Sequence, residues 1–355
     1  MRQALLLVFV AALSATLVVV NSVHGSSHAI AATALSPTDA TVATTASVAT
    51  STATTTAVTA SATGQSPTPK SATAVVYDED FPDPFVLTTA TGYVAFSTNS
   101  GDTNVPELVS NDLANWTAAG DALPTLPAWA RESGTWAPSV AEIGGAYVMY
   151  ITLFDTRRGR ECLFTASAAT ATGPYAVTDS NPLQCAANGS IDASVFSDAN
   201  GALWLTWKNE AHASQPATIV AAELNADGRS FASNPTALVT ADEAWEGGNV
   251  EGPSMIRSGD HYVLFFSTGA WTSTRYSTGY ATCTTPVGPC AVHDGAWLSS
   301  ADGLDGPGGL QAFTAADGST YVAFHTWVPC TDCAQWKRIL NLRAVDLSGT
   351  TPRLE

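Results

Sequence analysis

One sequence phrase returns five times between residues 81 and 327, and this repeat constrains the fold more than any other feature. Each copy has a short apolar strand, a turn containing Gly or Asp, and an aromatic strand that ends at or near Ser, Thr or His. The copies begin at Phe81, Trp136, Ile191, Val250 and Leu310. Equivalent points at positions 83, 139, 193, 252 and 311 are 54 to 59 residues apart.

Each repeat has room for a four-stranded sheet, because segments such as 163–168 and 218–224 supply further strands between the copies. A four-stranded sheet that recurs at this period is typical of a β-propeller. The sequence therefore predicts an all-β fold, a five-bladed β-propeller over residues 74–355. The alternative, a β-sandwich, gives no reason for the same phrase to return five times.

Carboxylates stand at the start of three of the five copies. They are Asp83, Asp192 and Glu251. Because the first strand of each blade lines the central channel, we expect them to meet around one cavity. Their mutual repulsion raises at least one pKa. One ionised and one protonated carboxyl group is what hydrolysis of a glycosidic bond requires.

Each carboxylate has a structural alternative. Asp83 precedes Pro84 and could be a turn residue. Asp192 could cap a turn. Glu246 competes with Glu251, but only Glu251 is in phase with the other starts of the repeat. We therefore take Asp83, Asp192 and Glu251 as the catalytic candidates.

Five short words, in this order, resemble glycoside hydrolase family 43. They are Asp80-Phe81-Pro82-Asp83-Pro84, the segment 110–117 (SNDLANWT), Trp136-Ala137-Pro138, the segment 191–196 (IDASVF) and Glu251-Gly252-Pro253. The resemblance extends from about Asp80 to the C-terminus and so covers the whole predicted propeller. It implies a five-bladed propeller that hydrolyses glycosides with inversion of the anomeric configuration.

The resemblance also implies a role for each carboxylate. Asp83 would be the general base that activates water, and Glu251 the general acid. Asp192 would tune the pKa of the acid and help to orient the substrate. Inversion needs the base and the acid roughly 6.5–9.5 Å apart, because water and sugar must both fit between them.

Three further residues are candidates for substrate binding. Trp136 offers a flat face on which a sugar ring can stack, or else packs between blades. The resemblance places His325 near the propeller axis, where some relatives hold calcium; a buried core histidine is the alternative. Arg338 resembles a family arginine that reaches sugar hydroxyls, and a surface salt bridge is its alternative.

The chain departs from the family pattern at one place. Many relatives have a histidine after Gly-Pro-Gly, whereas this chain has Gly306-Pro307-Gly308-Gly309. The departure puts the arrangement of water or calcium at the axis in doubt. We predict no required cofactor and no metal ligand, and leave a structural calcium at the axis open.

We interpret the chain as an inverting glycosidase of arabinose- or xylose-containing polysaccharide. An α-L-arabinofuranosidase or arabinanase is favoured over a β-xylosidase. A non-catalytic carbohydrate-binding propeller is disfavoured because all three carboxylates are present, and a fructan-acting propeller because no Asn-Asp-Pro-Asn phrase occurs. Segments 270–280 and 213–217 are candidates for the rim that selects substrate. Endo or exo action stays open.

The N-terminal region indicates export. Residues 1–25 have a positive start, an apolar run and small residues near 23–25, as in a secretory signal peptide; an uncleaved signal anchor is the alternative. Residues 26–73, rich in Ser, Thr and Ala, predict a disordered stalk. We expect a secreted, extracellular protein.

Charge and cysteine content agree with that location. The chain has 14 Lys and Arg against 31 Asp and Glu, a net charge of −17, which argues against nucleic acid or an anionic membrane as partner. We expect a monomer that binds polysaccharide or oligosaccharide. Proximity favours disulfides Cys162–Cys185 and Cys283–Cys290, while Cys330 and Cys333 close a tight loop or form a redox pair.

Overall fold

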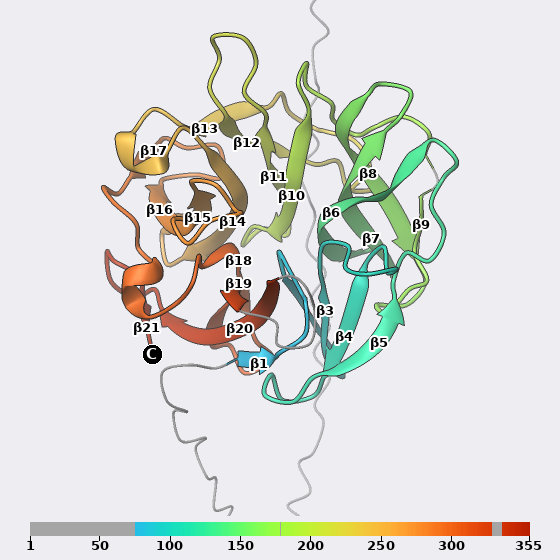
Figure 1. Cartoon of the computed structure of the whole chain (residues 1–355), viewed down its shortest axis with the longest axis horizontal. Coiled ribbons are helices and arrows are strands. Elements are labelled where there is room, and N and C mark those ends of the chain that lie inside the picture. The colour runs from blue at the N-terminus through green and yellow to red at the C-terminus, as the bar shows by residue number, and fades with distance from the viewer. Residues whose placement is uncertain (1–74, 178, 329–335) are drawn as a thin grey trace, which may run out of the picture. The chain divides into compact units, whose positions relative to one another are not determined.

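The computed structural model describes residues 75–177, 179–328 and 336–355. The predicted signal peptide (1–25), the predicted stalk (26–73) and the pair Cys330 and Cys333 lie outside the described residues. The described chain forms five antiparallel sheets set around a centre (Figure 1). This arrangement confirms the predicted five-bladed β-propeller.

Each blade runs outward from the channel in chain order. The first has β2 (Phe85–Thr89), β3 (Gly92–Phe96), β4 (Pro106–Ser110) and β5 (Thr117–Asp121). The second has β6 (Ala130–Ile143), β7 (Ala146–Asp155), β8 (Arg160–Ala168) and β9 (Ala176–Val177). The third has β10 (Ser190–Ser197), β11 (Leu203–Asn209), β12 (Thr218–Glu223) and β13 (Thr236–Thr240). The fourth has β14 (Val250–Ser258), β15 (His261–Thr268), β16 (Ser277–Cys283) and β17 (Cys290–Val292).

The fifth blade joins the two ends of the described chain. It contains β18 (Gly308–Thr314), β19 (Thr320–Val328) and β20 (Lys337–Asp346), with β1 (Val75–Tyr77) paired on the outer side of β20. A short strand, β21 (Arg353–Leu354), also pairs with β20. Because β1 precedes the first blade in sequence, its pairing with the last blade closes the ring. Two single-turn 3₁₀ helices, η1 (Ala244–Glu246) and η2 (Ser300–Asp302), lie in connections.

The five predicted repeat phrases form the two inner strands of the five blades. These are the hairpins β2–β3, β6–β7, β10–β11, β14–β15 and β18–β19. Most of the second strands are largely buried, which explains why their sequences are rich in aromatic and β-branched residues rather than alternating with polar ones.

Apolar side chains fill the space between neighbouring sheets. Phe96 of the first blade and Tyr175 of the second lie with their ring centroids 5.9 Å apart, and Tyr150 donates a hydrogen bond of 2.7 Å from the second blade to the carbonyl of Gly228 in the third. Large aromatic side chains bury much apolar area each, so such contacts contribute to the attraction between blades.

Polar side chains connect adjacent inner strands at equivalent places. Ser139 accepts a hydrogen bond from the amide of Val195, and Ser254 accepts one from Ala312. Gln311 uses both ends of its amide on the backbone of Val86, linking the last blade to the first. These contacts satisfy backbone groups on the edge of each innermost strand, which has no neighbouring strand on its channel side. They hold the inner strands in fixed relative positions.

The structure confirms both disulfides expected from proximity in the sequence. Cys162 in β8 bonds to Cys185 after β9, and Cys283 in β16 bonds to Cys290 in β17. Both tie down outer parts of their blades. Within the described residues, no helix has the length and hydropathy needed to cross a bilayer.

Candidate active site

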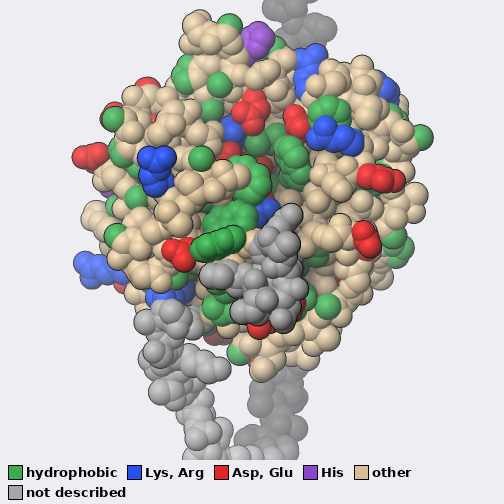
Figure 2. Space-filling view, viewed as in Figure 1, with side chains coloured by type: hydrophobic (Ala, Val, Ile, Leu, Met, Phe, Trp, Pro, Cys, Tyr) green, Lys and Arg blue, Asp and Glu red, His purple; other side chains and the backbone are tan. Residues whose placement is uncertain are grey.

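A pocket of about 690 Å³ opens at the centre of the ring, lined by the first residues of the inner strands. Figure 2 shows this hollow with acidic, basic and apolar side chains gathered around it. Five predicted site residues line the pocket: Asp83, Trp136, Asp192, Glu251 and Arg338. The sixth, His325, is fully buried and does not line it. Residues distant in sequence therefore meet in one place.

In each blade, the chain passes through the left-handed backbone region at the pocket, within the inner strand or, in the first blade, just before it. The five residues concerned are Asp83 (φ 50°), Ala137 (φ 43°), Asp192 (φ 60°), Gly252 (φ 55°) and Gly309 (φ 58°). In four blades the strand pairing is irregular at this point, as in a β-bulge. Non-glycine residues adopt this conformation at a cost and cluster at functional sites. Its effect here is to redirect side chains into the pocket.

This geometry corrects the repeat alignment made from sequence. The equivalent points of the second, third and fifth repeats are 137, 192 and 309, not 139, 193 and 311. Asp83 and Asp192 occupy the left-handed position itself. Glu251 precedes that position by one residue, as Trp136 does in the second blade. Glu251 is thus one step out of phase with the two aspartates.

Gly309 occupies the position after Gly-Pro-Gly at which the family resemblance led us to expect a histidine. A Cβ on Gly309 would lie 2.5 Å from Oδ1 of Asp83 and 2.7 Å from Nδ1 of His325. No side chain can occupy that space without displacing one of these groups. The glycine is therefore required by the close packing around Asp83.

The amide of the left-handed residue is held by the preceding blade. Four such amides donate to a side chain at the inner end of the previous second strand: Ala137 to Thr98, Asp192 to Thr152, Gly309 to Ser267 and Asp83 to His325. The fifth, from Gly252, donates to Oδ2 of Asp192 at 2.9 Å. These bonds fix the conformation from which the carboxylates project.

Asp83 is held as a carboxylate by its neighbours. Thr98 donates a hydrogen bond of 2.7 Å to Oδ2, and Nη1 of Arg338 lies 3.5 Å from the same oxygen. Burial alone would raise the pKa of Asp83, but the charge of Arg338 and, after it, the interactions with His325 and Thr98 outweigh burial, so the pKa is lowered. Asp83 is therefore ionised at neutral pH.

His325 supports Asp83 from behind the pocket wall. Its Nδ1 accepts the amide of Asp83 at 3.1 Å, so its proton is on Nε2. The ring stacks on Tyr276 with centroids 5.8 Å apart, and burial lowers the pKa of His325 to about 3. The imidazole is neutral, and its full burial leaves no surface for a sugar to touch.

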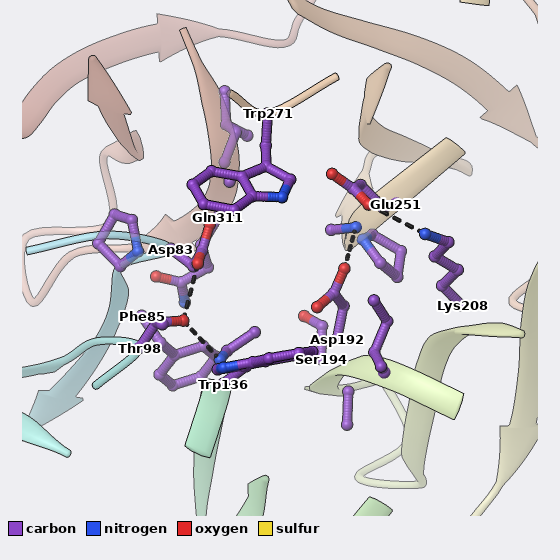
Figure 3. Close-up of a pocket in the computed structure, with 18 of the residues that line it drawn as sticks. Asp83, Phe85, Thr98, Trp136, Asp192, Ser194, Lys208, Glu251, Trp271 and Gln311 are labelled. Carbon is purple, nitrogen blue, oxygen red and sulfur yellow. Dashed lines mark hydrogen bonds and ion pairs between the residues drawn. The ribbon is translucent and has the colours of Figure 1, made fainter. Parts of the chain in front are cut away.

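Asp192 and Glu251 form a close pair of carboxyl groups on the other side of the pocket (Figure 3). Burial, and after it the charge of Glu251, raises the pKa of Asp192 to about 8. Like charges that share a site cannot easily ionise together. Asp192 therefore keeps a proton at neutral pH, beside the carboxyl group of Glu251.

Glu251 has a partner on each oxygen. Tyr276 donates to Oε1 at 2.9 Å, and Nζ of Lys208 lies 3.0 Å from Oε2. Burial, then the charge of Glu251, raises the pKa of Tyr276 well above its ordinary value, so the phenol stays a donor. The competing Glu246 does not line the pocket; its side chain accepts from the amide of Glu243 at the start of η1.

Two indoles flank the pocket on opposite sides, Trp136 and Trp271 (Figure 3). Trp271 is 47% exposed and stacks on Trp327, whose Nε1 donates to the Trp271 carbonyl at 2.8 Å. The Arg338 guanidinium lies 4.8 Å from the Trp271 ring centroid. Arg338 thus links the aromatic rim to Asp83 at the pocket floor.

Sequence reasoning missed Thr98 and Lys208 as residues of this site. It placed Trp271 and Tyr276 within the predicted rim segment 270–280 without singling them out. Thr98 and Lys208 are the last residues of the first and third repeat phrases, and this shared position is the sequence signal that could have found them. Of the two predicted rim segments, 270–280 contributes lining residues and 213–217 contributes none.

A calcium ion would require six to eight oxygen ligands. Within the described residues, no group of three or more His, Cys, Asp and Glu side chains is arranged to hold a metal ion. The pocket carboxylates already have protein partners, so the side chains present do not fit calcium as direct ligands. No chemical step is assigned to a metal.

Comparison with known proteins gives a family. The family model described as "Glycosyl hydrolases family 43" matches residues 72–350. The β-D-galactofuranosidase xynD of Aspergillus niger is 28% identical over 235 residues, which cover 61% of this chain and 64% of that protein. The "Probable arabinan endo-1,5-alpha-L-arabinosidase A" of Aspergillus flavus is 27% identical over 303 residues, covering 76% and 89%.

Solved structures share the fold. A thermostable family-43 glycoside hydrolase superposes with a TM-score of 0.72 at 24% identity, covering 80% of this chain and 96% of that chain. An exo-1,5-α-L-arabinanase from a bovine ruminal metagenomic library gives a TM-score of 0.62 at 21% identity, covering 81% and 100%. These structures are similar in the arrangement of their blades.

Proposed function

The chain belongs to glycosyl hydrolase family 43, and we propose that it hydrolyses α-L-arabinofuranosidic bonds in arabinose-containing polysaccharide with inversion. The observation that carries this proposal is the meeting of Asp83, Asp192 and Glu251 around one pocket, in unlike electrostatic surroundings. Groups whose surroundings push their pKa values apart can divide the roles of base and acid.

Asp83 is proposed as the general base. Its lowered pKa keeps it ionised, and its carboxylate borders the open pocket, where a water molecule can reach it. Arg338 and Thr98 hold the carboxylate in one orientation. A base must be unprotonated and fixed in position before it can take a proton from the attacking water.

Glu251 is proposed as the general acid, with Asp192 as its partner. Burial and the charge of Glu251 raise the pKa of Asp192, so Asp192 retains a proton at neutral pH next to Glu251. Transfer of that proton to Glu251 lets Glu251 pass it to the oxygen of the leaving sugar. Asp192 then carries the negative charge close by, which favours return of a proton to Glu251 after the product leaves.

Inversion is favoured by the arrangement of the carboxylates. Asp83 and Glu251 lie on opposite sides of the open pocket (Figure 3). An inverting enzyme needs this gap because water attacks one face of the sugar while the acid acts on the other. A nucleophilic mechanism would instead need the two carboxyl groups close together.

The substrate is inferred from the relatives and the pocket. Two relatives bear names of enzymes for arabinan and for β-D-galactofuranosides, both substrates with five-membered sugar rings. The two sugars share the same ring configuration, so one pocket can accept either. Trp136 and Trp271 offer faces on which sugar rings can stack. A β-D-galactofuranosidase is therefore the second candidate, supported by the relative from Aspergillus niger.

The proposed setting is extracellular. The sequence of residues 1–25 and the two disulfides are consistent with export into an oxidising environment. We propose that the protein acts there on polysaccharide or oligosaccharide. The strong negative charge does not hinder binding of a neutral sugar polymer.

The test is release of 4-nitrophenol from its α-L-arabinofuranoside, β-D-galactofuranoside and β-D-xyloside, together with sugar release from linear arabinan. We expect turnover of the arabinofuranoside and of arabinan. Asp83→Asn should reduce kcat/KM at least about 10²-fold with an unchanged melting temperature. Faster turnover of the galactofuranoside or xyloside would reassign the substrate, and no turnover of any of the four would favour a carbohydrate-binding role.

A further inference from the structure

One blade breaks the pattern by which the blades hold each other at the pocket. In four blades, the inner end of the second strand carries a hydrogen-bond acceptor for the next blade: Thr98, Thr152, Ser267 and His325. In the third blade that position is Lys208, which pairs with Ile191 as Thr152 pairs with Trp136.

A lysine cannot perform the task of the other four residues. An ammonium group has three donors and no acceptor, so Lys208 cannot receive the amide of Gly252. Asp192 accepts that amide instead. Burying an ammonium group also costs free energy unless it is paired. Lys208 therefore has a role that differs from accepting the amide of the next blade.

Lys208 is shared between two glutamates. Its Nζ lies 3.0 Å from Oε2 of Glu251 and 3.0 Å from Oε1 of Glu210. The Lys208 side chain is 4% exposed, that of Glu251 11% and that of Glu210 30%. Burial alone would lower the pKa of Lys208, but the charges of Glu251, Glu210 and Asp192 raise it. The ammonium is charged, and its attraction is divided between the two glutamates.

We propose that Lys208 and Glu210 together set how strongly Glu251 holds its proton. Lys208 is a positioning residue whose charge stabilises the Glu251 carboxylate, and Glu210 is the counter-charge that limits this effect. The proposal rests on the proposed function, in which Glu251 gives a proton to the leaving sugar. A lysine paired with Glu251 alone would stabilise the Glu251 carboxylate so strongly that Glu251 would lose its proton before the reaction. A lysine shared with Glu210 stabilises the carboxylate less, and so favours loss of the proton during the reaction.

The other ionisable groups around Glu251 do not supply this effect. Asp192 from β10 and Asp83 from the segment before β2 are negative when ionised and favour the protonated form of Glu251. Tyr276, from the loop before β16, is a neutral donor to Oε1. Among the described residues, Lys208 is the cation in contact with Glu251. The strength with which Lys208 acts on Glu251 therefore depends on its ion pair with Glu210.

The test compares Glu210→Gln and Lys208→Met with the wild type. Glu210→Gln removes the counter-charge, so Lys208 acts fully on Glu251, and the Glu251 titration midpoint should fall by about half a pH unit or more. Lys208→Met removes the cation, and the midpoint should rise by about one unit or more. Glu142→Gln, an exposed carboxylate on β6 with the same charge change, is the matched control and should leave the midpoint unchanged.

The midpoint is read by carbon-13 NMR of glutamate carboxyl carbons, with the Glu251 signal identified by its loss in Glu251→Gln. The alkaline limb of kcat/KM should move in the same directions, to lower pH in Glu210→Gln and to higher pH in Lys208→Met. If Lys208→Met does not fold, the shift of the Glu251 midpoint in Glu210→Gln alone tests the proposal.

Two results would overturn the proposal: a Glu251 midpoint in Glu210→Gln that matches the Glu142→Gln control, or shifts of the same sign in both variants. Absence of turnover in the wild type would instead count against the proposed function. The NMR midpoint does not depend on turnover. It would therefore still show whether Lys208 and Glu210 set how strongly Glu251 holds its proton. The two failures are thereby distinguishable.

Discussion

At the residue scale, the aspartates of the pocket owe their placement to a backbone conformation that usually belongs to glycine. Asp83 and Asp192 both have positive φ, and each amide is held by a side chain of the preceding blade. Asp and Asn tolerate this region better than most residues. The strain is offset by buried hydrogen bonds, which makes the orientation of each carboxylate rigid.

Arg338 provides a direct test of how Asp83 is kept ionised. Arg338→Gln removes the charge 3.5 Å from Oδ2 of Asp83, so the pKa of Asp83 should rise. Because Asp83 must be ionised to act as base, the acid limb of kcat/KM should move to higher pH by about one unit. Arg338→Lys keeps the charge and should retain most of the wild-type profile. An acid limb that stays in place in Arg338→Gln would contradict the role given to this ion pair.

At the scale of single elements, β4 of the first blade contains a buried carboxyl group that the site does not use. Glu107 is 3% exposed, and within the described residues its Oε1 has no hydrogen-bond partner. Burial, with a further contribution from Asp121, raises the pKa of Glu107 to about 7. A buried acid of this kind is best tolerated when it is protonated.

This strand should make stability depend on pH. The folded-state pKa of Glu107 lies above its ordinary value, so its contribution is fully present below about pH 4.5 and is lost as pH rises through about 7. Glu107→Gln removes that loss and should raise the free energy of unfolding at pH 8 by about 1–3 kcal/mol, with little change at pH 5. Calorimetric melting at both pH values, with Glu142→Gln as control, measures this. Equal effects at pH 5 and pH 8 would contradict it.

At the scale of the whole described chain, ring closure brings the site together. β1 pairs with β20, and Gln311 bonds to the backbone of Val86, so the last blade meets the first (Figure 1). The same closure places Arg338 of the last blade next to Asp83 at the start of the first. The base and its cation are therefore neighbours only when the ring is complete.

The repeat made most of this architecture predictable. Five phrases at one period were sufficient for the fold, and a carboxylate at three starts was sufficient to bring Asp83, Asp192 and Glu251 together. Register within the strand was not predictable, because a bulge adds a residue without changing the hydrophobic pattern. The interpretation therefore placed Glu251 in phase with the aspartates, although it precedes the left-handed position by one residue.

Contacts between blades were also beyond the sequence. Lys208 meets Glu251 only where the third and fourth blades pack, and Trp271 meets Arg338 only where the fourth and fifth blades pack. His325 was expected near the axis, but no pattern in the chain indicated that its ring would accept the amide of Asp83. Polar partners separated by more than 200 residues leave no periodic signal.

The most direct test of the whole account is the anomeric configuration of the first product, followed by proton NMR during hydrolysis of an α-L-arabinofuranoside. Five blades that hold Asp83 and Glu251 on opposite sides of one pocket predict that β-L-arabinofuranose appears first and only later mutarotates. Initial release of α-L-arabinofuranose would mean a covalent intermediate, and it would contradict the assignment of Asp83 as a base acting through water.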